Sequence, residues 1–465
     1  MDILLTHGYF LAHDEAEKKV MKPYPPLGLL YISSHLKACG FGVEILDTTF
    51  LTIETALAAL EAKSPRLVGI YVNLITRRNA LRLIAKCKDI GAIVVLGGPE
   101  PANYVEEYLG RGADVIVSAE GELTLEELIP HIRRYGLSRL ETVRGLHFKR
   151  DDGEIVFTGP RAQIGDLDAQ PFPDRASIDI EQYLRTWQVH HGVRSVSLIT
   201  ARGCPYTCSW CSHSVYGRTH RRRLPENVAD EIAMIREVYR PDQLWYADDV
   251  FTIHQKWLDR FAAELKRRGL DHPFETITRE DRLNENVVRT LAGMGCYRLW
   301  IGAESGSQRI LDAMDRRTDA ARMRDMIGLV KEHGIRAGTF IMVGYEGETW
   351  NDIDLTARHL RDAAPDDVLT TLSYPIKGTP YYDQVADRIV SRVNWEDGSD
   401  RELRIKGRKS KRFYSHAQRW LHAEAELARI GHGAKANWQR RVKVKASAAV
   451  SRLGMYVTRN EVEYG

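Results

Sequence analysis

The chain has 465 residues, a length that predicts two to four domains of ~100–200 residues each. Hydrophobic residues make up 43% and charged residues 28%, which excludes a broadly disordered chain. The 66 Lys+Arg against 63 Asp+Glu leave a formal net charge of +3, which excludes a uniformly basic nucleic-acid binder.

Targeting segments are not predicted. No apolar run approaches the ~18 residues of a transmembrane helix. The N-terminal sequence MDILLTHGYF is soon followed by charged residues, so it resembles neither a signal peptide nor a transit peptide. Six cysteines, three of them crowded together, do not make a disulfide scaffold in a chain of this length. We therefore expect a cytoplasmic protein.

Residues 1–140 alternate short apolar runs with amphipathic stretches. The runs that predict strands are residues 2–6, 43–47, 67–71, 93–96 and 115–118. The stretches that predict helices are residues 28–38, 53–62, 80–88, 102–109 and 124–134. This strict alternation predicts a flavodoxin-like, Rossmann-type α/β domain, which is a doubly wound parallel sheet with helices on both faces.

Such sheets bind ligands beyond the carboxyl ends of their strands. The candidate ligand contacts at those ends are His7, Gly8, Asn73, Gly97, Gly98, Glu120 and Gly121. Two glycines at 97 and 98 let the backbone approach a flat ligand closely, or they make a tight turn, and the sequence leaves both interpretations open. Neither GxGxxG nor a P-loop motif occurs, so the usual nucleotide signals are absent.

Residues 141–192 are predicted as a connector that contains a hairpin, with its strands at 146–149 and 155–158. A second alternating series follows, with predicted strands at 196–200, 243–247, 274–278, 298–302, 338–343 and 367–373. Six such units predict a partial (β/α)6 barrel over residues 193–395, with its active site at the carboxyl ends of the strands.

Residues 396–465 lack this alternation and are predicted as a basic helical extension, with an amphipathic helix at 411–429. From residue 401 onward, 16 Lys+Arg and 5 Asp+Glu give a net charge of +11. This extension could meet an anionic substrate or a membrane surface. A solvated basic helix that covers the open side of the barrel is the alternative.

Three cysteines lie in one loop directly after the first predicted barrel strand. Cys204, Cys208 and Cys211 have the spacing C-x3-C-x2-C. Three thiolates on one loop can hold three irons of a [4Fe–4S] cluster and leave the fourth iron open for catalysis. A zinc site with His213 as fourth ligand has unsuitable spacing, and a disulfide does not suit a cytosolic chain. We therefore predict a catalytic cluster.

The motif resembles the signature of the radical SAM superfamily, CxxxCxxC with an aromatic residue before the last cysteine, here Trp210. The resemblance implies that S-adenosylmethionine binds the open iron. Trp210 could form a wall for its adenine, with core packing as the alternative. Asp248 and Asp249 follow the second strand, where the family contacts the methionine part, and we expect only one of them to face the cofactor.

The resemblance continues through the later strands. Glu304 and Ser305 follow the fourth strand, where family members place a ribose or amino contact. Gly344 lies in residues 340–348, which resemble the segment along the adenine, and residues 374–380 resemble the end of the sixth strand. An acceptor such as the Glu304 carboxylate suits the ribose diol.

A flavodoxin-like domain before such a barrel resembles the cobalamin-binding class of this superfamily. The segments that carry the likeness are residues 25–29, 97–99 and 119–122. The branch resembled includes the anaerobic magnesium-protoporphyrin monomethyl ester cyclase and hopanoid methylases. The motif DxHxxG is absent, so no histidine from it ligates cobalt. A domain that merely docks on the barrel is the alternative to cobalamin binding.

The resemblance implies an enzyme that cleaves S-adenosylmethionine reductively to a 5′-deoxyadenosyl radical, which takes hydrogen from an unactivated substrate position. Methyl transfer from methylcobalamin is then expected, with cyclisation or ring rearrangement, as on a tetrapyrrole, as the alternative. A tRNA-modifying enzyme is disfavoured because the first domain has only Cys39 and Cys87 for a second cluster. A cobalamin sensor would not need the three-cysteine motif.

The expected partners are a small-molecule or natural-product substrate and a reductase, flavodoxin or ferredoxin as electron donor. We expect no nucleic acid and no transmembrane segment. Peripheral membrane contact through the basic extension is compatible with its charge.

Overall fold

The computed structural model describes residues 1–433 and 436–463. The chain forms two compact units. The first contains Met1–Pro205, Ser212–Asp242 and Val393–Ser399, and the second contains Tyr206–Cys211, Gln243–Arg392 and the chain from Asp400 onward. The cysteine loop passes from one unit into the other, so Cys204 belongs to the first unit, and Cys208 and Cys211 to the second.

The first unit is built on a seven-stranded sheet in the order β2-β1-β3-β4-β5-β6-β7. Its strands are β1 (Ile3–His7), β2 (Val43–Leu46), β3 (Leu67–Tyr71), β4 (Ile93–Gly97), β5 (Val115–Val117), β6 (Leu146–Lys149) and β7 (Ile155–Phe157). The first five are parallel, which confirms the predicted doubly wound sheet. The predicted hairpin, β6 and β7, pairs antiparallel onto β5 and so extends this sheet.

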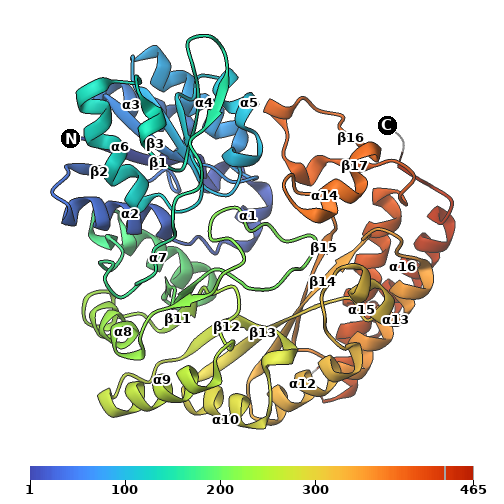
Figure 1. The fold of residues 1–465 in the computed structure, drawn as a ribbon. Helices are drawn as coiled ribbons and strands as arrows, with labels where there is room; N and C mark the ends of the chain where they lie inside the picture. The colour runs from blue at the N-terminus through green and yellow to red at the C-terminus, as the bar shows by residue number, and fades with distance from the viewer. Residues whose placement is uncertain (434–435, 464–465) are drawn as a thin grey trace. The chain divides into compact units, whose positions relative to one another are not determined.

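Helices cover both faces of this sheet (Figure 1). Apolar residues of α3 (Ile53–Lys63), α4 (Arg77–Asp89) and α5 (Val105–Gly110) form one buried cluster with the strands. Those of α2 (Leu27–Ala38) and α6 (Glu122–Tyr135) form the other. Since β3 lies on the opposite side of β1 from β2, the strand order reverses at β1, where such sheets bind ligands.

Short elements complete the first unit. They are α1 (Glu15–Val20), α7 (Ile180–His191), β8 (Ser195–Leu198), the antiparallel pair β9 (Ala201–Arg202) and β10 (Arg221–Arg222), and α8 (Pro225–Tyr239). Proline suits the first position of α8 because its missing N–H would have no partner there. β8 is the first predicted barrel strand, and β9 leads from it into the cysteine loop.

The second unit contains five strands that pair parallel in chain order. They are β11 (Gln243–Tyr246), β12 (Phe274–Thr278), β13 (Cys296–Glu304), β14 (Arg336–Val343) and β15 (Asp367–Leu372). The helices of this unit before its C-terminal part are α9 (Gln255–Arg268), α10 (Glu285–Gly293), α11 (Gln308–Ala313), α12 (Ala320–Glu332), α13 (Trp350–Ala363) and α14 (Pro380–Val385). Because the strands are parallel, their carboxyl ends lie along one edge of the sheet.

The C-terminal part of this unit contains β16 (Ile389–Val390), β17 (Arg404–Ile405) and two long helices. The helices, α15 (Lys411–Gly431) and α16 (Trp438–Thr458), pack side by side (Figure 1). The helix predicted at 411–429 is thus α15, and α15 also packs on α13 and β15. Among the described residues, no helix is both long enough and apolar enough to cross a membrane.

Candidate cofactor sites

The cysteine loop starts at a position that only glycine fits. Gly203 has φ +85°, and a Cβ there would lie 2.4 Å from the backbone oxygen of Thr219. The loop then presents Cys204 half-buried, Cys208 buried and Cys211 exposed. Three thiols with this spacing are a donor set that fits a [4Fe–4S] cluster with one open iron.

Cys208 lies beside two cations. Arg279 Nη1 is 3.7 Å from the Cys208 sulfur, and Arg316 Nη1 is 3.9 Å from it. Burial raises the pKa of the Cys208 thiol, and the Arg279 guanidinium counteracts that rise. Arg279 is held in place by Asp281 (2.8 Å) and by the ring of Tyr206, 3.7 Å from its guanidinium carbon. The two cations therefore favour the thiolate form, which is the one that ligates iron.

Hydrogen bonds fasten the rest of the loop to the second unit. The Ser209 hydroxyl bonds the Tyr345 hydroxyl at 2.6 Å, and the backbone N–H of Ser209 donates to the Met314 carbonyl at 3.0 Å. Half-buried Trp210 packs against an apolar cluster that includes Met314 and Tyr381. This placement corresponds to the core-packing alternative for Trp210, and its role beside an adenine stays a prediction.

Acidic residues stand at two strand ends of the second unit. Asp248, after β11, is buried, whereas Asp249 is exposed. Desolvation by the surrounding protein and the neighbouring Asp248 raise the pKa of Asp249. Glu304 ends β13 at a bulge, with φ +63°. Desolvation raises the pKa of half-buried Glu304 to about 7, and Arg279 counteracts this rise. The two aspartates thus differ in exposure. That only one of them faces the cofactor stays a prediction.

Two further predicted contacts, Ser305 and Gly344, form hydrogen bonds within the protein. The Ser305 side chain is fully buried, and its hydroxyl accepts a hydrogen bond from the N–H of Ser307 at 3.1 Å. Gly344 follows β14 with φ +78°, and its N–H donates to Glu348 at 2.6 Å. A Cβ at Gly344 would lie 2.7 Å from a methyl group of Leu372, so this turn requires glycine.

Sequence analysis missed three charged residues of this region. Arg279 and Glu280 directly follow β12, and Arg316 follows α11. Glu280 is fully buried, and among the described residues neither carboxylate oxygen has a hydrogen-bond partner. Burial, followed by the charge of Asp281, raises the pKa of Glu280 to about 7. The signal that could have found Arg279 and Glu280 is their position at the end of a predicted barrel strand.

A cavity of about 370 Å³ opens at the carboxyl ends of the strands in the first unit. Of the predicted contacts, Gly97, Gly98, Glu120 and Gly121 line it, together with apolar residues of β1, β3, β4, β5 and α2. Gly98 has φ +108°, and a Cβ there would lie 2.4 Å from the Val72 carbonyl oxygen. This small-residue, largely apolar pocket is large enough for part of a corrinoid ligand.

The other three predicted contacts lie outside the cavity lining. Buried His7 bonds Asp47 at 3.0 Å. The Asn73 side chain accepts from the N–H of Ile75 at 3.1 Å, which makes a local turn. A Cβ on Gly8 would lie 2.8 Å from the backbone of α4, so this glycine permits close packing. The structure gives all three a role in the fold of the domain.

The chain downstream of the cysteine loop also reaches this cavity. Val215 and Tyr216 line it, and the Ser214 hydroxyl donates to the Pro99 carbonyl at 2.6 Å. Arg202, which also lines the cavity, pairs with Glu120 and Glu122 at 2.7 Å each. The cavity is therefore bounded on one side by the residues that flank the cysteine loop.

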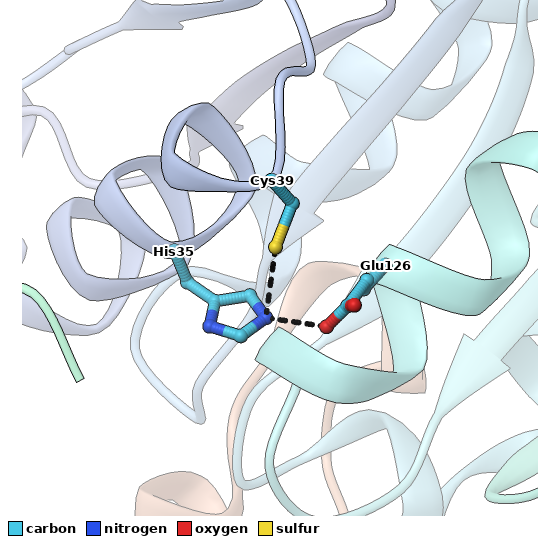
Figure 2. A group of neighbouring side chains, drawn as sticks. All are labelled: His35, Cys39 and Glu126. Atoms are coloured by element: carbon cyan, nitrogen blue, oxygen red, sulfur yellow. Dashed lines mark hydrogen bonds and ion pairs between the residues drawn. The ribbon is translucent and has the colours of Figure 1, made fainter. Parts of the chain in front are cut away.

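A separate group of possible ligating side chains joins α2 to α6, as Figure 2 shows. His35 Nε2 lies 2.8 Å from a Glu126 oxygen and 3.9 Å from the Cys39 sulfur. His35 Nδ1 bonds the side-chain oxygen of Gln170 at 2.9 Å. Cys39 is exposed, and Glu126 is half-buried. These hydrogen bonds of His35 connect the two helices and the connector.

Comparisons with known proteins match two segments of the chain to known families. Residues 198–360 match the Radical SAM superfamily, and residues 18–129 match the B12 binding domain. The chain is 28% identical to an uncharacterized methyltransferase, PH0819, of Pyrococcus horikoshii over 80% of this chain and 81% of that one. It is 27% identical to the anaerobic magnesium-protoporphyrin IX monomethyl ester cyclase of Rubrivivax gelatinosus over 79% of this chain and 67% of that one.

Solved structures share the fold. The cobalamin-dependent S-adenosylmethionine radical enzyme OxsB, with aqua-cobalamin bound, matches 98% of this chain and 72% of its own at a TM-score of 0.74 and 18% identity. The protein is thus a radical SAM enzyme that carries a B12-binding domain. Its relatives include methyltransferases and a cyclase. The predicted family and the predicted pairing of the two domains are confirmed.

Proposed function

We propose that this enzyme transfers a methyl group to an unactivated carbon of a small-molecule substrate. When bound, the cluster supplies the electron that cleaves S-adenosylmethionine to a radical able to take a substrate hydrogen, and methylcobalamin supplies the methyl group. Residues 1–140 hold the corrinoid, residues 193–395 carry the radical chemistry, and residues 396–465 form the extension. The observation that carries the proposal is Cys208, a buried thiol in a three-cysteine loop, flanked by two guanidinium groups.

The three loop cysteines and acidic residues of the second unit would hold the cluster and its ligand. Cys204, Cys208 and Cys211 ligate three irons, as the spacing of their thiols suggests. Asp249, the exposed member of its pair, accepts hydrogen bonds from the ammonium of S-adenosylmethionine. Glu304, at the end of β13, accepts hydrogen bonds from the ribose diol.

The cavity of the first unit would hold part of the cobalamin. Gly97, Gly98 and Gly121 let a flat ligand approach the backbone, and Glu120 offers a polar edge. No histidine is among the described residues that line this cavity, so none of them offers an imidazole to cobalt. This agrees with the absence of DxHxxG from the sequence.

A second candidate function is radical cyclisation. It is favoured by the three anaerobic magnesium-protoporphyrin IX monomethyl ester cyclases among the relatives, at 24–27% identity. Methyl transfer is favoured by cytidylyl-2-hydroxyethylphosphonate methyltransferase of Streptomyces wedmorensis (24%) and hopanoid C-3 methylase of Methylococcus capsulatus (23%). We further propose a cytoplasmic enzyme that a flavodoxin, ferredoxin or reductase reduces, with peripheral membrane contact through the basic extension and no nucleic-acid partner.

Anaerobic purification with cobalamin supplied, followed by iron, sulfide and cobalt analysis of one sample, tests the proposal. About four irons and one cobalt per chain are expected. Incubation with S-adenosylmethionine labelled in its methyl group should then yield 5′-deoxyadenosine. Transfer of the label to the protein-bound corrinoid is also expected. Four irons without cobalt would overturn methyl transfer and leave the cluster assignment standing.

A further inference from the structure

The last described helix, α16, has two apolar faces, and the rest of the chain that the structure describes covers one of them. The covered face of α16 consists of residues spaced three or four apart, namely Val444, Ala448, Ser451, Met455 and Thr458. These residues are buried, and the helix packs on α15. A Cβ on Gly454 would lie 2.3 Å from the His416 ring, so the two helices approach closely.

The opposite face of α16 is apolar and open to solvent. Two positions along a helix correspond to a turn of about 200°, so the residues two before each buried one point away from α15. The large exposed side chains of this outer face, with their exposed fractions, are Trp438 (72%), Val442 (56%), Val450 (65%), Leu453 (61%), Tyr456 (55%) and Val457 (67%). Exposed Ala446 and Ala449 make the stripe continuous. A stripe of this length on one helix marks an interaction surface.

Positive charge borders this stripe on both sides. α16 contains five Lys and Arg and no acidic residue. Arg440 pairs with Glu426 at 2.6 Å, and Arg452 lies 3.6 Å from Asp354. Arg441, Lys443 and Lys445 are exposed, and none of them forms an ion pair with any residue described in 1–433 or 436–463. Their charge is therefore available to an external anion.

We propose that the outer face of α16 docks on a bilayer that contains anionic lipids. An exposed apolar stripe bordered by Lys and Arg is the pattern by which amphipathic helices lie in the membrane interface. Trp438 and Tyr456, near the two ends of the stripe, have amphipathic rings that suit this boundary. A second copy of the chain fits less well, because two identical faces would bring their basic borders together without an acidic partner.

Docking through α16 is the specific form of the membrane contact proposed above, and it does not require the proposed methyl transfer. Full-length, cluster-loaded enzyme is sedimented with phosphatidylcholine vesicles, with or without about one third phosphatidylglycerol. We expect at least tenfold tighter partitioning to the anionic vesicles, with a loss of binding as salt rises. Replacing Leu453 and Val457 together by Asp should lower that partitioning at least tenfold, with iron content and cleavage of S-adenosylmethionine unchanged.

Two matched controls separate docking from general effects of charge. Val189→Asp alters an exposed apolar residue (78%) on α7 and should leave vesicle binding unchanged. The double variant Lys443→Gln/Lys445→Gln should bind the anionic vesicles more weakly, and its binding should depend less on salt. The double variant Lys149→Gln/Lys266→Gln removes the same charge from other exposed positions and should bind like the wild type. Equal binding to neutral and anionic vesicles, or wild-type binding by the double Asp variant, would overturn the proposal. A wild-type dimer in sedimentation velocity would also overturn the proposal if the double Asp variant, and none of the control variants, were monomeric.

Discussion

Arg202 and Glu120 form a buried ion pair in the first unit, with Arg202 Nη1 2.7 Å from Glu120 Oε1. Arg202 also reaches Glu122 at 2.7 Å, and Arg221 binds the other oxygen of Glu120. Arg202 stands two residues before Cys204, and Glu120 lines the cavity assigned to cobalamin. One guanidinium therefore ties the wall of the cavity to the strand that leads into the cysteine loop.

Replacing Arg202 by Met should destabilise the first unit by about 3–5 kcal/mol, because buried Glu122 would lose its pair with Arg202 and buried Glu120 would keep its pair with Arg221. Urea unfolding measures this loss, and cobalt analysis of the loaded enzyme should show lower occupancy. Arg150→Met is the control, since Arg150 pairs with Glu141 and Glu154 at the surface and should cost less than about 1 kcal/mol. Equal effects of both variants would show that the buried pair has no special role.

The two glycines at the end of β4 should respond differently to alanine. A Cβ on Gly98 meets the Val72 carbonyl oxygen at 2.4 Å in a left-handed backbone, whereas a Cβ on Gly97 meets nothing within 4 Å. Gly98→Ala should therefore lower cobalt occupancy severalfold and destabilise the domain by more than about 1 kcal/mol. Gly97→Ala, whose added methyl group meets no protein atom within 4 Å, is the control for stability, and iron content should not change in either variant. Normal cobalt binding by Gly98→Ala would place the ligand elsewhere.

Each cysteine of the loop should be required for chemistry. Replacing Cys204, Cys208 or Cys211 by Ala should abolish formation of 5′-deoxyadenosine, because a cluster with fewer than three protein ligands is not retained. Cys296, buried in β13 and outside the loop, provides the control, and Cys296→Ala should keep both its iron and its activity. Activity that survives in all three loop variants would refute the cluster assignment.

The contribution of Glu280 to the stability of the cofactor-free protein should fall as pH rises from ~4.3 toward 7. Burial raises the pKa of Glu280 to about 7, so the folded state holds a proton that the unfolded state has already released. This contribution is fully present below the unfolded pKa of ~4.3, and it is lost as pH rises through about 7. A shift of this size corresponds to a loss on the order of 3 kcal/mol.

Urea unfolding between pH 5 and pH 8 gives the corresponding measurement. Glu280→Gln carries a neutral side chain at every pH, so its unfolding free energy should decline less across this range. Glu332→Gln, an exposed substitution on α12, serves as the control and should follow the wild-type profile. Parallel profiles for Glu280→Gln and the wild type would show that Glu280 does not carry this proton.

Local patterns predicted both sheets and the cluster motif. The strands of the first sheet, β1 to β5, formed where short apolar runs alternate with amphipathic stretches, because period and run length are properties of neighbouring residues. The three loop cysteines could be predicted as cluster ligands from spacing alone, since the ligands of such a cluster come from one short segment. Gly97 and Glu120 were placed at the cavity because parallel strands bring their carboxyl ends to one edge.

Contacts between distant segments needed the tertiary structure. Arg279 and Arg316 approach Cys208 from 71 and 108 residues away, and nothing in their local sequence marks that proximity. His7 lies at a predicted strand end, yet its ring is hydrogen-bonded to Asp47, 40 residues away. The sequence by itself thus determined the two α/β sheets and predicted the cluster ligands, which both depend on local spacing. Packing alone decided which charged groups surround those ligands and which strand-end residues line a cavity.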